Sequence, residues 1–292
     1  MKSIGIVTDS HSGISQEEAA RLGIRILPMP FYINEECYFE GVTISRDTFF
    51  EKLRDGAQVA TSQPSPADVM TLWDEALAEY EQILYLPISS GLSGSYATAM
   101  TLAQNEPYEG RVFVVDNGRV STLLHQTVLD ALELIDEGYS VIEIREILER
   151  SRGEMVIYVG VQTLEYLKRG GRISPATASL GTLLNIKPVL KFDVGTLDTF
   201  KKCRGFGKAK SSMLEAVQHD LDTTFRDAYE NREIHLLAAS SASKEETAEW
   251  IAEIQAAFPD LEVLYDDLTL GLSCHIGEGG LGIGLSRKPK RS

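Results

Sequence analysis

The segment Ile4-Gly5-Ile6-Val7-Thr8-Asp9-Ser10 decides the fold class, because it joins a short β-branched run to a polar turn. Ile4–Val7 is typical of a buried strand, and the turn leads into a helix expected over Ser15–Leu22. Ser15 and Glu18 have the spacing of a capping box at the start of that helix. A strand followed by a helix is the repeating unit of an α/β protein.

The same alternation continues to about residue 150. Further strands are expected over Ile24–Leu27, Met29–Ile33, Ile83–Leu86 and Val112–Val115, and further helices over Ser45–Leu53, Ala67–Tyr80, Ser93–Ala103, Ser121–Ile135 and Val141–Arg150. This order predicts a first α/β domain over residues 1–152 with a largely parallel sheet. The polar stretch Ser151–Glu154 marks its boundary.

Beyond the boundary the pattern changes to strands joined by tight turns, with two long helices between them. Strands are expected over Val156–Val159, Val189–Phe192, Thr196–Lys202, Ile234–Ala238, Glu262–Tyr265 and Ser273–Ile276, and helices over Gly207–Phe225 and Lys244–Phe258. We therefore predict a second α/β domain over residues 153–292, with a mixed or antiparallel sheet and helices packed on it.

The composition excludes several classes of partner. The chain has 43 acidic and 28 basic residues, a formal net charge of −15, so its surface repels nucleic acid and anionic membranes. No apolar run approaches the ~18–20 residues that span a bilayer, and the first residues lack the pattern of a secretory signal. The three cysteines have no disulfide or zinc spacing. These features predict a cytoplasmic protein without stable membrane insertion.

Segments that resemble known nucleotide-binding or metal-binding motifs lack the surrounding sequence that those motifs require. The run Gly277–Gly282 matches GxGxxG, but only ten residues follow it, too few for the βαβ unit that a dinucleotide site requires. Gly207-Lys208 lacks the earlier glycine of a P-loop, and no histidine has metal-ligand spacing. The sequence therefore predicts no nucleotide cofactor and no metal.

Three hydroxyl-rich turns remain as candidates for chemistry: Thr8–Ser10, Thr61–Pro66 and Ser89–Ser95. We expect all three at the carboxyl ends of strands of a parallel sheet, where ligands bind. Ser93 opens a helix whose dipole favours an anion. Because none of the turns contains lysine or arginine, a carboxyl group suits them better than a phosphate.

Structural explanations stay open for each candidate. Thr61 and Ser62 fit strand-end residues, Ser93 fits a helix N-cap, His275 fits an interior histidine, and Arg204 fits a solvated turn. A third interpretation comes from Gly91–Ser95, a near match to the GxSxG nucleophile elbow. It predicts a serine hydrolase or esterase with Ser93 as nucleophile and His275 as base, oriented by Asp9 or Asp116.

The order of several motifs resembles the DegV family over nearly the whole chain. The motifs are Val7–Ser10, Thr61–Pro66, Ser89–Tyr96, Val114–Asp116, Tyr166–Ser174, Leu184–Leu190, Cys203–Gly205 with Lys208-Ala209, and His275 followed by Gly277, Gly279 and Leu281–Gly284. The resemblance implies two α/β domains with a long-chain fatty acid, such as palmitate, stearate or oleate, buried between them. It also implies a carrier similar to the binding subunit of bacterial fatty acid kinase, in which a separate kinase phosphorylates the carboxyl.

The family's site residues carry over by position. The resemblance implies that Thr61 and Ser93 hydrogen-bond the carboxyl group, with Ser62 and the Gly94 amide beside them and His275 near the head group. Two basic positions complete the set: Arg204 as a contact for the kinase or the phosphate, and Arg172 at the rim. No residue is expected to be catalytic.

Two segments depart from the family pattern. Leu123-Leu124-His125 is bulkier than the usual helix start and is expected to narrow the pocket, and Glu278 brings an acid close to the head group, where it could pair with His275. Phe31–Ile33, Leu180–Leu184 and Leu268–Leu272 are candidates to line the acyl chain. A carboxylate buried there without a cation would have a raised pKa.

Overall fold

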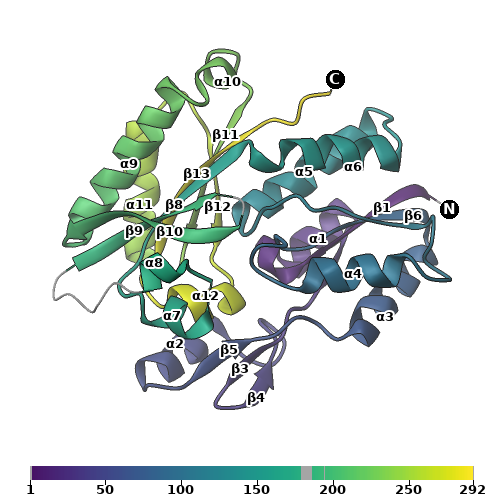
Figure 1. Cartoon of the computed structure of the whole chain (residues 1–292), viewed down its shortest axis with the longest axis horizontal. Helices are drawn as coiled ribbons and strands as arrows, with labels where there is room; N and C mark the ends of the chain where they lie inside the picture. The colour runs from purple at the N-terminus through teal and green to yellow at the C-terminus, as the bar shows by residue number, and fades with distance from the viewer. Residues whose placement is uncertain (1, 179–185, 194, 292) are drawn as a thin grey trace.

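The computed structural model describes residues 2–178, 186–193 and 195–291, which contain three sheets (Figure 1). The first sheet confirms the predicted parallel arrangement. Its strand order is β2-β1-β6-β7, and all its pairs are parallel. The strands are β1 (Lys2–Asp9), β2 (Arg25–Leu27), β6 (Tyr80–Leu86) and β7 (Val112–Val114).

Helices cover both faces of this sheet. Successive side chains of each strand point to opposite sides, so each strand packs against both helical layers. Ile6 and Leu84 pack on one helical layer, whereas Val7 and Ile83 pack on the other. The first layer is α1 (Gln16–Leu22), α5 (Thr122–Asp136) and α6 (Val141–Arg150); the second is α3 (Pro66–Leu77) and α4 (Ser95–Ala103). Two short 3₁₀ turns, Ser10–Ser12 and Ser151–Gly153, complete this half.

The second sheet confirms the predicted mixed arrangement, with the order β10-β9-β8-β13-β11-β12. Only β11 and β12 pair in parallel, and the other neighbours are antiparallel. The strands are β8 (Met155–Gly160), β9 (Ile186–Asp193), β10 (Thr196–Arg204), β11 (Ile234–Ser240), β12 (Val263–Asp267) and β13 (Leu281–Arg287). α9 (Phe206–Asp222) and α11 (Lys244–Ala257) cover one face, α10 (Arg226–Glu230) follows α9, and the opposite face meets the first half of the chain.

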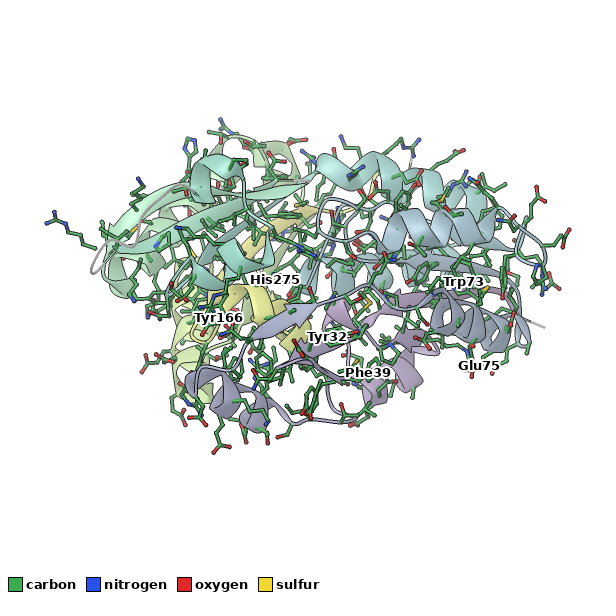
Figure 2. The ribbon with its side chains drawn as sticks, turned by 60° about the horizontal axis from the view of Figure 1, so that its bottom comes forward. Tyr32, Phe39, Trp73, Glu75, Tyr166 and His275 are labelled. Atoms are coloured by element: carbon green, nitrogen blue, oxygen red, sulfur yellow. The ribbon has the colours of Figure 1, made fainter. Side chains whose placement is uncertain are left out.

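A small third sheet, β4-β3-β5, comes from the first half of the chain but packs against the second. It comprises β3 (Phe31–Ile33), β4 (Glu36–Tyr38) and β5 (Val59–Thr61), with α2 (Arg46–Arg54) beside it. Figure 2 shows Tyr32 of this sheet near the helices that carry Tyr166 and His275, which are α7 (Glu165–Gly170) and α12 (Leu270–Ile276). The Nη1 and Nη2 atoms of Arg46 donate to the carbonyls of Leu268 and Ser240.

This packing means that sequence order and spatial grouping differ over residues 31–61. Because a segment of the predicted first domain packs against the second half of the chain, the predicted domain boundary between residues 152 and 153 stays a prediction. One more helix, α8 (Pro175–Ala178), lies between α7 and β9. None of the helices in the described ranges combines the length and apolar character needed to cross a membrane.

Two elements near the end of the chain differ from expectation. Ser273–Ile276, expected as a strand, is the last part of α12, which begins after Thr269 and ends at Gly277 with a φ of +78°. The glycine run that follows leads into β13, a central strand that the sequence analysis missed. A Cβ on Gly284 would lie 2.7 Å from the Val156 carbonyl oxygen, so glycine is needed for close strand pairing there.

Asp9 is fully buried at the end of β1 and joins this strand end to Ile88, which follows β6 just before the hydroxyl-rich turn Ser89–Ser95. Its carboxyl accepts hydrogen bonds from the backbone N–H groups of His11 (2.9 Å) and Ile88 (2.7 Å). Burial nevertheless raises its pKa to about 7. The folded state therefore holds a proton on Asp9 over a pH range in which the unfolded chain has lost it.

We predict that Asp9 makes the free energy of unfolding fall as the pH rises from about 4 to about 7. A raised native pKa stabilises the fold below the unfolded value of 3.8, and this contribution is lost up to about 7. Its size is on the order of 4 kcal/mol, since one pKa unit corresponds to about 1.4 kcal/mol. Urea unfolding at several pH values should show this slope in the wild type and in Asp260→Asn, an exposed control. An unchanged slope in Asp9→Asn would contradict the assignment.

Candidate functional site

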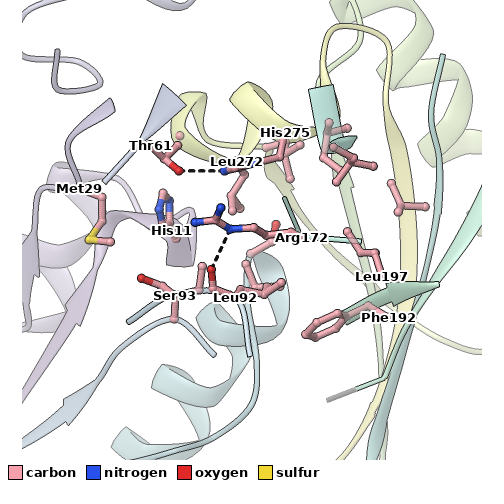
Figure 3. A pocket seen from close by; sticks show the side chains of 18 of the residues that line it. His11, Met29, Thr61, Leu92, Ser93, Arg172, Phe192, Leu197, Leu272 and His275 are labelled. Atoms are coloured by element: carbon pink, nitrogen blue, oxygen red, sulfur yellow. Dashed lines mark hydrogen bonds between the residues drawn. The ribbon is translucent and has the colours of Figure 1, made fainter. Parts of the chain in front are cut away.

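A cavity of about 240 Å³ lies where the parallel sheet, the mixed sheet and α12 meet. Most of its wall is apolar, contributed by Met29, Ile88, Leu92, Val120, Ile157, Val159, Leu167, Phe192, Leu197, Leu268, Leu272 and Ile276. The polar lining residues are His11, Thr61, Ser62, Gln63, Ser93, Ser121, Arg172 and His275. Figure 3 shows Thr61, Ser93, His11 and the guanidinium of Arg172 gathered at one end, with Phe192 and Leu197 at the other.

Thr61 and His275 meet at the polar end, where Thr61 Oγ1 lies 2.9 Å from His275 Nε2. Thr61 ends β5 of the small antiparallel sheet, not a strand of the parallel sheet as expected. The imidazole lies against Gly170, where a Cβ would overlap its Nδ1 atom. Burial, and then the positive charge of Arg172, lower the pKa of His275 to about 4, so the ring is neutral at pH 7.

Ser93 lies in the turn between β6 and α4. Its Oγ is 2.8 Å from Ser95 Oγ and accepts a hydrogen bond from the Ser95 N–H. α4 begins at Ser95 with Gly94 as N-cap, so Ser93 and Gly94 lie at the positive end of the helix dipole. A Cβ on Gly94 would lie 2.8 Å from Gln63 Oε1, which makes the close approach of the two turns dependent on glycine.

Arg172 provides the cation that the three hydroxyl-rich turns lack. It follows the left-handed C-cap Gly171 of α7, and its guanidinium donates to the carbonyls of Leu92 (Nε, 3.2 Å) and Gly170. Among the described residues it forms no ion pair, although the chain carries an excess of acids. Arg172, 79 positions after Ser93, thus brings a positive charge to the rim position that the resemblance implied, and carboxylate binding there stays a prediction.

Six of the seven predicted site residues line this cavity: Thr61, Ser62, Ser93, Gly94, Arg172 and His275. Arg204 does not line it; its side chain is exposed at the end of the edge strand β10. The sequence analysis missed His11, Gln63 and Ser121. His11 and Gln63 lie within or next to the motifs already singled out, so their proximity to those motifs was an available signal.

Several expectations about the pocket wall were wrong. Phe31 and Ile33 pack in a separate core with α2 and α12, and Leu123-Leu124-His125 faces the protein interior, not the cavity. Glu278 pairs with Arg54 at 2.5 Å and not with His275. Leu268 and Leu272 line the cavity as expected, and Leu180–Leu184 lies outside the described residues.

The geometry does not support the hydrolase interpretation. A nucleophilic serine needs a hydrogen bond to its base, and the base needs an orienting acid. Here Ser93 contacts Ser95, and His275 Nε2 contacts Thr61. Both proposed acids are engaged elsewhere, Asp9 by backbone N–H groups and Asp116 by Arg152 at 2.6 Å and Ser90. The described residues also contain no cluster suited to a metal ion.

The fold and the cavity define a class of protein with one parallel and one mixed α/β sheet that enclose an internal pocket between them. Within this class the chain belongs to the DegV family: the family model described as "Uncharacterised protein, DegV family" matches residues 3–288. A DegV domain-containing protein from Deinococcus radiodurans is 34% identical over 287 residues, covering 97% of this chain and 98% of that protein. Protein DegV from Bacillus subtilis is 30% identical over 289 residues, covering 96% and 98%.

Solved structures agree with this assignment. A DegV family protein from Thermus thermophilus, described for its fatty acid binding, superposes with a TM-score of 0.87 at 35% identity, covering 98% of this chain and 99% of that one. DegV from Bacillus subtilis, described as a fatty acid binding protein, has a TM-score of 0.84 at 29% identity, covering 99% and 100%.

We predict that Arg172→Met raises the pKa of His275, because it removes a positive charge that disfavours the imidazolium. Burial still holds the value below that of a free histidine. The measurement is an NMR titration of the His275 ring resonance. Arg204→Met removes an exposed cation outside the cavity and should leave the resonance unchanged. Equal titration curves in the Arg172→Met protein and the wild type would show that the two side chains are not coupled.

Proposed function

We propose that this chain binds a long-chain fatty acid, with the carboxylate at the polar end of the cavity and the acyl chain along its apolar walls. The observation that carries the proposal is Arg172. It is a half-buried cation without an anionic partner among the described residues, beside the hydroxyls of Thr61 and Ser93 and at the end of an apolar cavity. An amphipathic anion satisfies both parts of such a site.

The head group needs few contacts. A carboxylate can accept from the guanidinium of Arg172 and from the hydroxyls of Thr61 and Ser93, while the neutral His275 serves as an uncharged partner. The cation also influences the protonation state of the bound carboxyl group. Because an adjacent guanidinium favours the ionised form, we expect the bound acid to stay a carboxylate at neutral pH.

The tail supplies most of the affinity. Each buried CH₂ contributes about 0.8 kcal/mol, so an acyl chain such as that of palmitate, stearate or oleate binds mainly through the apolar wall. The Thermus thermophilus and Bacillus subtilis relatives, at 35% and 29% identity, are described as binding fatty acids, which supports the same ligand class here.

We further propose that the chain is a carrier subunit and not an enzyme: it presents the carboxyl to a separate fatty acid kinase, which forms the acyl phosphate. Ser62 and Gln63 line the cavity and are exposed, so a partner could reach the head group from their side. Arg204 is an exposed cation outside the cavity and is our candidate contact for that kinase.

We predict that protein purified from bacteria contains about one fatty acid per chain, identified by mass spectrometry of an organic extract. Thr61→Ala and Ser93→Ala should each weaken palmitate binding about five- to tenfold, since each removes a hydrogen bond worth about 1 kcal/mol or more. Thr101→Ala is the matched control, because Thr101 is exposed on α4 and does not line the cavity. An extract without fatty acid, together with no measurable palmitate binding, would overturn the proposed function.

For the carrier role we predict that a purified kinase subunit with ATP phosphorylates palmitate only when this protein is present. Arg204→Ala should lower kcat/KM for acyl phosphate formation while the Kd for palmitate stays unchanged, because Arg204 lies outside the cavity. Arg226→Ala removes another exposed cation, on α10, and serves as the control. If the two variants behave alike, Arg204 is not the kinase contact; if the wild type supports no phosphorylation, the carrier role fails.

A further inference from the structure

Two polar side chains of the cavity, His11 and Ser121, are not needed to bind a carboxylate. Both are more than nine-tenths buried, with exposed fractions of 6% and 8%, and both line the cavity. They are joined through the backbone, since the Ser121 N–H donates to the His11 carbonyl at 2.9 Å. Polar groups buried in an apolar wall are costly unless they find hydrogen-bond partners, so their presence requires an explanation.

The imidazole of His11 is held in place on one side and open on the other. Its Nδ1 lies 3.4 Å from Thr269 Oγ1, whereas Nε2 has no hydrogen-bond partner within the described residues. The ring packs so closely on α12 that a Cβ on Gly271 would overlap its Cε1 atom. Burial lowers the pKa of His11 to about 3, so the ring acts as a neutral hydrogen-bonding group.

Ser121 has a backbone conformation that disfavours any residue with a side chain. Its φ of +56° and ψ of −143° are typical of glycine, and strain of this kind gathers at functional sites. The residue lies just before α5 but does not cap the helix with its side chain. The Oγ atom has no partner in the described part of the chain. A glycine would avoid both the strain and the unpaired hydroxyl.

His11 lies near the carboxyl end of the proposed ligand, and Ser121 adjoins it through their backbone hydrogen bond. The His11 ring packs on Gly271, and His275 follows Gly271 by four residues on the same face of α12, about one helical turn or ~5.4 Å further along. In Figure 3 His11 accordingly lies at the Thr61 end of the cavity, away from Phe192 and Leu197. An acyl chain bound there exposes its first carbons to this pair.

We propose that His11 and Ser121 form a second polar subsite that recognises a hydroxyl group on the acyl chain close to the carboxylate, so that the cavity takes 2- or 3-hydroxylated fatty acids as a ligand class. The inference rests on the proposed fatty acid binding and specifies its substrate. A ligand hydroxyl can donate to the open Nε2 of His11 and accept from Ser121 Oγ, which satisfies both groups at once.

The test compares palmitate with 2-hydroxypalmitate, 3-hydroxypalmitate and 16-hydroxypalmitate by competition against a fluorescent fatty acid. At least one of the 2- and 3-hydroxy acids should bind the wild type as tightly as palmitate or more tightly, whereas the 16-hydroxy acid should bind more weakly because its hydroxyl enters the apolar end. His11→Leu and Ser121→Ala should each lower the affinity for that preferred acid about tenfold relative to the affinity for palmitate. Met29→Leu alters the apolar wall only and should leave the ratio of the two affinities unchanged.

The outcomes separate this inference from the proposed function. If the wild type binds none of the acids, the proposed function itself fails. If palmitate binds but both near-end hydroxy acids bind more weakly than palmitate, the subsite is wrong and fatty acid binding stands. Equal losses for palmitate and the preferred hydroxy acid in both variants would assign a structural role to the pair. Should His11→Leu not fold, Ser121→Ala decides the question alone.

Discussion

A cation at the end of an apolar cavity constrains the rest of this structure. Arg172 lies just beyond the last turn of α7, and its guanidinium contacts only carbonyl oxygens among the described residues. Carbonyls satisfy hydrogen bonds but leave the charge uncompensated in a medium of low polarity. Burial, and then this charge, lower the pKa of His275, and no carboxylate within the described residues forms an ion pair with the guanidinium. This uncompensated charge is the observation on which the proposed binding of a carboxylate rests.

The cavity also depends on side chains that pack directly against the backbone, and glycines make this possible at three places. Gly170 leaves room for the His275 ring, Gly271 for the His11 ring, and Gly94 for the side chain of Gln63. Each of these contacts brings together segments that are far apart in sequence. The glycine run Gly277–Gly282, which resembles a dinucleotide fingerprint, instead ends α12 and leads into β13. Gly94, Gly170 and Gly271 therefore serve the close packing around the cavity.

Elements with a strong hydrophobic periodicity could be predicted from the sequence. The prediction failed for elements that are very short or contain several glycines. The parallel and mixed sheets followed from alternating β-branched runs and capped helices, whereas Ser273–Ile276 was too short to distinguish strand from helix. β13 was missed because its glycines lack strand propensity. For the site, the hydroxyl turns identified Thr61 and Ser93, but no local pattern could bring Arg172 beside them. That contact depends on how the two halves of the chain pack.

In the proposed carrier, the acyl tail and the carboxylate bind at opposite ends of the cavity, and this affects how the ligand is released. A sixteen-carbon chain that is fully buried gains on the order of 12 kcal/mol from its methylenes, so spontaneous release would be slow. A carrier bound this tightly delivers its cargo best if the chemistry takes place while the tail stays in the pocket. The exposed residues Ser62 and Gln63 lie at the polar end, whereas Phe192 at the apolar end is buried. Polarity and exposure therefore increase toward the same end of the cavity, and under the proposed carrier role a partner would reach the bound acid from that end.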